Sequence, residues 1–235
     1  MLNPDGVIAG NYRTSMAGSD LNRKFDDPDH RLHPTVWNIK RMTEQITQSS
    51  VQNLQFYLDM HGHSRKKNVF IFGPQVPIHS DQYLKMRIIP KLIAEETEMF
   101  RYHSCTFSNE KSKETAARTT LHRQFNIYNC FTLEASFHGY FDREKVTNEF
   151  TESLYEQMGI NLVNSLYEYV MITEEDDRRK QLSKIERLKK QTNKLERRGK
   201  KSKGKLQQSA KDQNPNEPNT ARDTYFEESK EQQNR

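Results

Sequence analysis

Residues 54–63, LQFYLDMHGH, alternate apolar and polar side chains with a period of two. This period is typical of a β-strand whose two faces meet different surroundings. His61 lies on the polar face with Asp59, and His63 rejoins that face if the strand continues. Gly62 equally permits a turn that ends the strand, because glycine adopts backbone angles closed to other residues. Two surface histidines at a strand end and a functional pair are both consistent with this stretch.

Strand-like and helix-like patterns alternate along the first 173 residues, which favours a layered α/β domain with a mostly parallel sheet. A turn-forming Asn-Pro-Asp-Gly stretch begins at residue 3, and Pro90 is a candidate kink within a helix. Apolar periodicity predicts strands at 54–61, 69–72 and 130–137, and helices at about 34–49, 83–100, 111–127 and 151–171.

The strand predicted at 130–137 carries a carboxylate close to its end. Thr132, Glu134 and Ser136 alternate with apolar residues, so Glu134 lies on the polar face of an otherwise buried strand. Ligands bind beyond the carboxyl ends of strands in open α/β sheets, which makes this position a candidate site. A buried carboxylate is costly unless it is hydrogen-bonded or paired, so an ion pair with a neighbouring arginine is the structural alternative.

Positive charge is concentrated behind residue 173. Residues 178–205 contain 14 Lys or Arg and two Glu, and they follow four consecutive acidic residues at 174–177. The net charge of +5 therefore comes from this tail rather than from the globular part. We predict two parts, a domain over 1–173 and a charged low-complexity tail over 174–235. Residues 178–205 are either a solvated basic helix or a disordered arm, and residues 206–235, rich in Gln, Asn, Asp and Glu, are expected to be disordered.

The two cysteines, Cys105 and Cys130, cannot form a disulfide framework, and no CxxC spacing suggests a thiolate metal site. A reducing compartment is the natural inference. No apolar run approaches the roughly 18 residues that span a bilayer, and the N-terminus has no signal-peptide pattern. We expect a cytoplasmic protein.

Five stretches, MLNPDGVIAGNYR, AGSDLNRKF, YLDMHGHSRKKNVFIFG, KSKETAAR and FTLEASFHG, resemble the cytosolic carboxypeptidase branch of the M14 zinc metallocarboxypeptidases. They occur in the family's order and cover about residues 1–140. The resemblance implies a three-layer α/β/α sandwich around a mixed eight-stranded sheet, here incomplete at its N-terminus. Residues 1–173 are then a partial catalytic domain.

The resemblance also assigns roles to five residues. His61 matches one zinc ligand, which the family combines with the His and Glu of an HxxE motif. Glu134 matches the general base that takes a proton from zinc-bound water, whose pKa the metal brings to about 7. Arg13 matches the arginine that polarises the scissile carbonyl. Asn22 and Arg23 match the pair that binds the substrate's terminal carboxylate, which a guanidinium grips through two hydrogen bonds.

Members of this branch remove glutamate from protein C-termini or from acidic tails such as those of tubulin, so the resemblance implies a basic side-chain pocket. Lys111, Lys113 and Arg118 are candidates for it, although they could equally be solvated charges on a helix surface. Arg13 and Arg23 have a similar alternative as surface ion-pair residues. The implied function is zinc-dependent hydrolysis of C-terminal residues.

One family motif is missing. None of the eight histidines is followed three residues later by Glu, so the sequence contains no HxxE motif. One histidine does not hold a catalytic zinc. We therefore expect an N-terminally truncated domain that binds zinc weakly, hydrolyses little, and exposes an unpaired sheet edge.

Two other classes of function stay open. The chain could be an inactive carboxypeptidase-like protein that docks on acidic polymers through its basic tail. A nucleic-acid-binding protein is the other possibility, and it rests on the tail alone. The tail's sequence does not choose among a microtubule surface, a nucleic acid and an anionic lipid.

Overall fold

A computed structural model describes residues 1–49 and 54–211, with the backbone alone described for 192–211. The chain divides into two compact units, Met1–Thr173 and Glu174–Arg235. In the part that the structure describes, no helix is long and apolar enough to cross a membrane.

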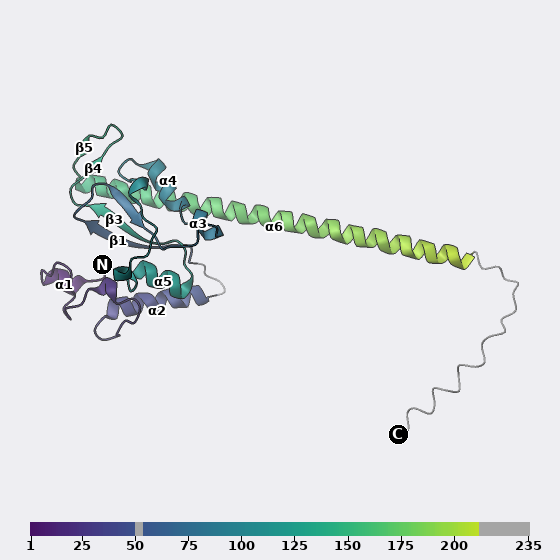
Figure 1. Ribbon diagram of the computed structural model, residues 1–235, viewed down its shortest axis with the longest axis horizontal. Helices are drawn as coiled ribbons and strands as arrows, with labels where there is room; N and C mark the ends of the chain where they lie inside the picture. Colours follow the sequence, from purple (N-terminus) through teal and green to yellow (C-terminus); the bar gives the residue numbers. More distant parts are fainter. Residues whose placement is uncertain (50–53, 212–235) are drawn as a thin grey trace, which may run out of the picture. The chain divides into compact units, whose positions relative to one another are not determined.

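A three-stranded sheet forms the centre of the first unit (Figure 1). Its strands are β1 (Tyr57–His63), β2 (Val69–Phe72) and β3 (Cys130–Ser136), in the order β1-β3-β2. β3 pairs with β1 in parallel and with β2 in antiparallel orientation, so the sheet is mixed as predicted. Parallel pairing does not predominate in these three strands, and β1 stands at an edge. A separate ribbon joins β4 (Tyr140–Phe141) to β5 (Thr147–Asn148).

Helices cover both faces of the sheet, in three layers. On one face, α4 (Ile88–Glu96) and the first part of α6 (Glu152–Lys211) enclose a core that includes Ile71, Phe131 and Leu133. On the other face, α2 (Pro34–Gln48) and α5 (Ala117–Phe125) enclose a smaller core around Cys130. Alternation along β3 thus sends Phe131 and Leu133 to one layer, and Cys130 to the other.

Several helix boundaries in the structure differ from the predicted ones, for reasons of backbone hydrogen bonding. The Asn-Pro-Asp-Gly stretch is a short helix, α1 (Pro4–Ile8), because the Asn3 side chain accepts a hydrogen bond from Gly6 N at 3.3 Å. The helix expected over 83–100 is two helices, α3 (Asp81–Lys85) and α4, and the chain breaks before Pro90 rather than at it. Pro90 lies in the first turn of α4, where its missing N–H costs nothing.

The helix expected over 111–127 also begins later. Residues Lys111–Lys113 form a 3-10 turn, η3, and α5 starts at Ala117. Asn126 ends α5 in the left-handed conformation with φ of 55°. Two further 3-10 turns are η1 (Leu21–Arg23) and η2 (Tyr102–Ser104).

The last helix is longer than the predicted 151–171. Its first part buries Met158, Leu162 and Tyr169 against the sheet. The Tyr169 hydroxyl accepts a hydrogen bond from Asn129 Nδ2 at 2.7 Å, which satisfies a buried donor of that amide. The tail is helical as far as Lys211, so the helical alternative holds over 178–205, and the disorder expected from residue 206 is wrong for 206–211. Residues 212–235, which share that expectation, lie outside the described residues.

Candidate functional site

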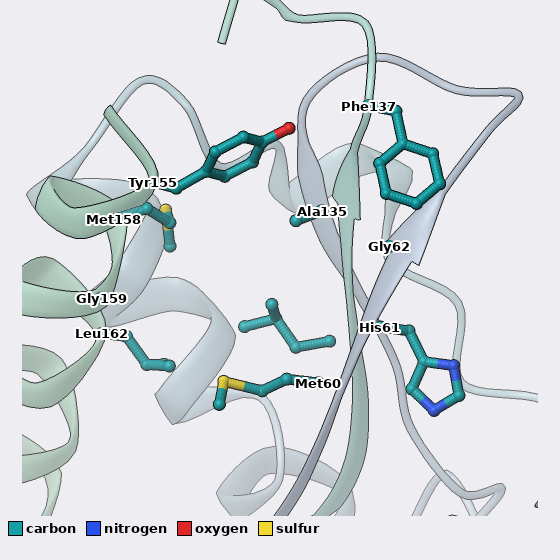
Figure 2. A pocket seen from close by; sticks show the side chains of 10 residues that line it. Met60, His61, Gly62, Ala135, Phe137, Tyr155, Met158, Gly159 and Leu162 are labelled. Atoms are coloured by element: carbon teal, nitrogen blue, oxygen red, sulfur yellow. The ribbon is translucent and has the colours of Figure 1, made fainter. Parts of the chain in front are cut away.

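β1 continues through Gly62, so His61 and His63 share one face of the sheet. In the register of β1 with β3, His61 lies opposite Glu134 and His63 opposite Ser136. Figure 2 shows the His61 ring on the opposite side of β1 from Met60. Gly62 leaves room for the exposed Phe137 ring, since a Cβ at residue 62 would stand 2.2 Å from it. The strand, not a turn, therefore sets the direction of both imidazoles.

Asp59 and Asn22 hold the His61 ring. His61 Nε2 lies 2.9 Å from Asp59 Oδ2 and 3.3 Å from Asn22 Nδ2. The hydrogen bond to Asp59 raises the pKa of His61, and the Asp59 and Glu134 charges raise it further against burial and the Arg13 charge. This bond places the ring proton on Nε2 in the neutral form, so Nδ1 carries the lone pair that an electrophile needs.

Glu134 is mostly buried, with 14% of its side chain exposed, and it faces an imidazole. Its Oε2 lies 3.6 Å from His63 Nδ1. The His63 ring meets the Phe70 ring edge-on at 5.1 Å between centroids, and its Nε2 is buried without a hydrogen bond. Within the described residues, the close side-chain contact of Glu134 is with this histidine and not with an arginine, contrary to the structural alternative.

The turn η1 brings Asn22 beside β1, and Arg23 follows in the same turn, where its guanidinium donates to Asn22 O at 2.7 Å. Asp20 starts the turn, because its Oδ1 accepts a hydrogen bond from Asn22 N at 3.0 Å. Its Oδ2 also binds Arg13 Nε at 2.8 Å, so the exposed Arg13 has the ion pair that the surface alternative expected. Asn22 Nδ2 contacts Asp59 Oδ2 at 3.2 Å, and Ala117 N donates to Asn22 Oδ1 at 2.9 Å. Asn22 thus joins η1, β1 and the start of α5.

Arg118 is buried, so a solvated helix-surface charge is the wrong interpretation for it. Its guanidinium donates to Thr132 Oγ1 at 3.4 Å and lies 5.3 Å from the centre of the Phe72 ring. Its Nε is buried and has no hydrogen-bond partner in the described structure. A buried guanidinium with an unused donor is costly, which makes it a candidate for an anionic ligand.

The charges of three arginines act on Lys113. Burial lowers the pKa of Lys113, and the charges of Arg23, Arg13 and Arg118 lower it further, whereas Glu110 opposes them. Four cations from positions far apart in the sequence therefore act on one region. Such a cluster is suited to a ligand that carries more than one carboxylate.

Three interactions of the site were missed by sequence reasoning. Asp20 pairs with Arg13, Thr132 accepts from Arg118, and His63 faces Glu134. The alternation that placed His61 with Asp59 was a usable signal, because residues two apart on a strand share a face. No local sequence pattern predicts the contacts of Asp20 and Thr132, because the arginines that they bind come from other parts of the chain.

Comparison with known proteins identifies relatives. No family model matches the chain. Mouse cytosolic carboxypeptidase 3 is 38% identical over 173 residues, which are 72% of this chain and 17% of the mouse protein. Human cytosolic carboxypeptidase 6 is 34% identical over 175 residues, which are 72% of this chain and 34% of the human protein. The chain is homologous to the cytosolic carboxypeptidases of the M14 family.

Solved structures of metallo-carboxypeptidases share the fold of this chain. The metallo-carboxypeptidase from Burkholderia cenocepacia superposes with a TM-score of 0.61 at 20% identity, covering 73% of this chain and 43% of that one. The metallo-carboxypeptidase from Pseudomonas aeruginosa gives the same TM-score at 21% identity, covering 74% and 44%. The chain therefore has a carboxypeptidase-like α/β fold of which it represents a part.

The carboxypeptidase family is normally zinc-dependent. Catalytic zinc sites use three protein ligands and one open position. Across the described side chains of residues 1–49 and 54–191, no group of three or more His, Cys, Asp or Glu could hold a metal ion. His61 offers one ring nitrogen, while Asp59 is engaged with the other. The described residues therefore do not fit a catalytic zinc by themselves.

Proposed function

We propose that this chain provides the basic and carboxylate-bearing side of a cytosolic carboxypeptidase active site, which removes C-terminal residues from peptides and proteins. Glutamate is the proposed residue, and acidic tails such as those of tubulin are the proposed substrates. The observation that carries the proposal is the buried Arg118 with a free Nε donor, close to Lys113 and on the same side of the sheet as Glu134.

Each residue of the candidate site has a separate proposed task. Arg23 binds the terminal carboxylate of the substrate, and Asn22 positions the edge of that subsite through its bonds to Asp59 and Ala117. Arg118 and Lys113 bind the acidic side chain. Arg13 stabilises the negative charge that develops on the scissile carbonyl oxygen. These assignments divide the cations between ground-state binding and catalysis.

Glu134 is the proposed general base. Its carboxylate would accept a proton from the attacking water and deliver it to the leaving amine. His61 is proposed as one ligand of the family's zinc, with Nδ1 as the donor atom because Asp59 engages Nε2. The remaining ligands would have to come from outside the described residues, and the tasks of Arg118 and Arg23 do not depend on the metal.

A binding experiment tests the substrate assignment without hydrolysis. A fluorescent peptide ending in two glutamates is titrated against the full chain, against Arg118→Ala and against Arg31→Ala. Arg118→Ala is expected to weaken binding about tenfold or more, because a charge-assisted hydrogen bond is lost from a desolvated site. Arg31 is an exposed arginine outside the site, and its substitution controls for net charge. Equal affinities for the two variants would refute the assignment.

Glu134→Gln tests the catalytic role where zinc-dependent release of glutamate is measurable. The variant keeps the shape of the side chain and removes its basic oxygen, so release is expected to fall by about 100-fold or more. Binding of the same peptide should be unchanged. An undiminished rate of release would refute the general-base assignment.

A second function, docking of an inactive protein on acidic polymers, is favoured by the tail helix. Its described basic side chains are exposed, and the described donor set is insufficient for catalytic zinc. We propose that this helix binds acidic tails such as those of tubulin. Microtubule pelleting in rising salt tests it, using the full chain with Lys184, Arg187 and Lys189 changed to Gln. Loss of pelleting supports docking, and pelleting unchanged by substitution and by salt contradicts it.

A further inference from the structure

The first part of α6 is apolar on two opposite sides. Met158 and Leu162 are buried and point toward the sheet (Figure 2). Ile160, Val163 and Tyr167 lie on the other side of the helix, and they are 55%, 63% and 67% exposed. A helix that packs on one sheet normally has a charged or polar outer face. The apolar outer face of α6 therefore indicates a second packing partner.

The row of outer residues continues along α6, which is a single helix from Glu152 to Lys211. Residues three or four positions apart lie on the same side of a helix. From Ile160 onward, exposed residues follow one another at these intervals as far as Ile185. We call this row the outer stripe, and its members are Ile160, Val163, Tyr167, Met171, Glu174, Arg178, Gln181 and Ile185.

Two opposite charges interrupt the apolar residues of the outer stripe. Glu174 and Arg178 are exposed, and neither forms an ion pair with a described residue. Their neighbours differ, because Glu175 binds Arg179 within the same helix. The charges that lie on the outer stripe are thus the ones that remain available to a partner.

The second part of α6 also has an apolar residue without packing. Every side chain that the structure describes over residues 174–191 is exposed, and Ile185 has 47% of its surface exposed. Most helical stability in proteins comes from packing of an amphipathic face rather than from intrinsic propensity. A helix that continues through this segment is therefore expected to pack against another surface.

We propose that two copies of this chain associate through their outer stripes, with the two α6 helices antiparallel. The charges on the stripe select the partner and the direction. In a parallel pair, equivalent residues share a layer, so Glu174 would face Glu174 and Arg178 would face Arg178. In an antiparallel pair, Glu174 of one copy faces Arg178 of the second copy, and the symmetric contact pairs the other two charges.

This charge pair also fixes which apolar residues meet. Seven positions away from it, Tyr167 of one copy lies opposite Ile185 of the second copy, because residues seven apart occupy equivalent places along paired helices. The two-fold symmetry repeats the same contact at the other end. Exposed apolar residues on both sides of the charges are thereby covered by each other, which explains why one helix carries both groups.

The inference goes beyond the proposed function, and no residue of the outer stripe belongs to the candidate site. Loss of the dimer would therefore leave the substrate assignment of Arg118 untouched. Failure of glutamate binding in Arg118→Ala would likewise leave the dimer in place.

A charge exchange tests the pairing in sedimentation equilibrium of the full chain, which is expected to show a dimer. Glu174→Lys and Arg178→Glu should each weaken the dimer about tenfold or more, because each places like charges opposite one another. The double variant should restore it, since the exchanged charges pair again between copies. Glu186→Lys and Arg187→Glu are the matched controls, because they make the same charge changes away from the outer stripe.

Circular dichroism of each variant verifies that it is folded, and all substituted residues are exposed. A monomeric wild-type chain would overturn the proposal. So would a double variant that dimerises no better than the two single variants, or controls that weaken the dimer equally.

Disulfide trapping tests the antiparallel direction. A chain that carries both Tyr167→Cys and Ile185→Cys should form covalent dimers when diamide oxidises the thiols, whereas Ile185→Cys alone should not. The two new thiols cannot join within one chain, because 18 residues of helix separate them by about 27 Å. The wild-type chain controls for Cys105 and Cys130. Covalent dimers of Ile185→Cys alone would mean a parallel pair and would contradict the proposal.

Discussion

Asn22→Ala should destabilise the first unit far more than a surface asparagine change does. Asn22 Oδ1 accepts from the buried Ala117 N at 2.9 Å, so its removal leaves a backbone donor without a partner at the start of α5. A buried donor left unsatisfied costs about 1 to 3 kcal/mol, and the lost contact with Asp59 adds about 1 kcal/mol. The expected loss is about 2 to 4 kcal/mol.

Urea unfolding followed by the fluorescence of Trp37, the sole tryptophan, measures this loss within the first unit. Asn38→Ala is the matched control, because the exposed Asn38 amide binds only its own helix, at Pro34 O. Its expected effect is within about 0.5 kcal/mol. Equal unfolding free energies for the two variants would refute the argument that Asn22 joins η1, β1 and α5.

Two further predictions follow from the shifted pKa values. Asp59→Asn should lower the pKa of His61 in an NMR titration, because the hydrogen bond that raises it is weakened. Since the raised pKa stabilises the protonated folded state, the part of the lost stability that is linked to His61 should be fully present below about pH 6.5 and should disappear as the pH rises through the folded pKa, whereas the part due to the Asn22 contact should remain. Equal losses at acidic and alkaline pH would contradict this. Burial raises the pKa of Cys105 to about 11, so iodoacetamide should alkylate it at pH 8 on the order of 100-fold more slowly than a free thiol, and rapid alkylation of the folded chain would contradict the burial.

Periodicity predicted the strands well, because the alternation of apolar and polar residues along a strand is a local signal. The strand at Val69–Phe72 agrees with its predicted bounds, and the strand at Cys130–Ser136 ends one residue early. The backbone conformation at Gly62 could not be predicted from the sequence, since glycine permits both a turn and the close approach of another side chain. In the structure the strand continues through Gly62, and the ring of Phe137, 75 positions away, lies where a Cβ would be.

The helices were predicted less accurately at their ends, for a similar reason. Helical spacing continues from residue 83 to 100, but the chain breaks between Lys85 and Ile88 and buries Ile89 and Ile93 on the second segment. Capping decides such boundaries by single hydrogen bonds, which periodicity does not register. Basic spacing in the tail left a helix and a disordered arm equally open, because exposed Lys and Arg are compatible with both.

In the candidate site too, local motifs predicted some residues, whereas contacts with distant residues decided the surroundings of others. Motif order brought Asn22, His61 and Glu134 forward as candidates, and the structure brings His61 and Glu134 into register on neighbouring strands. Whether Arg118 was solvated or buried could not be decided from its helix, since Phe72 and Thr132 enclose it from two other strands.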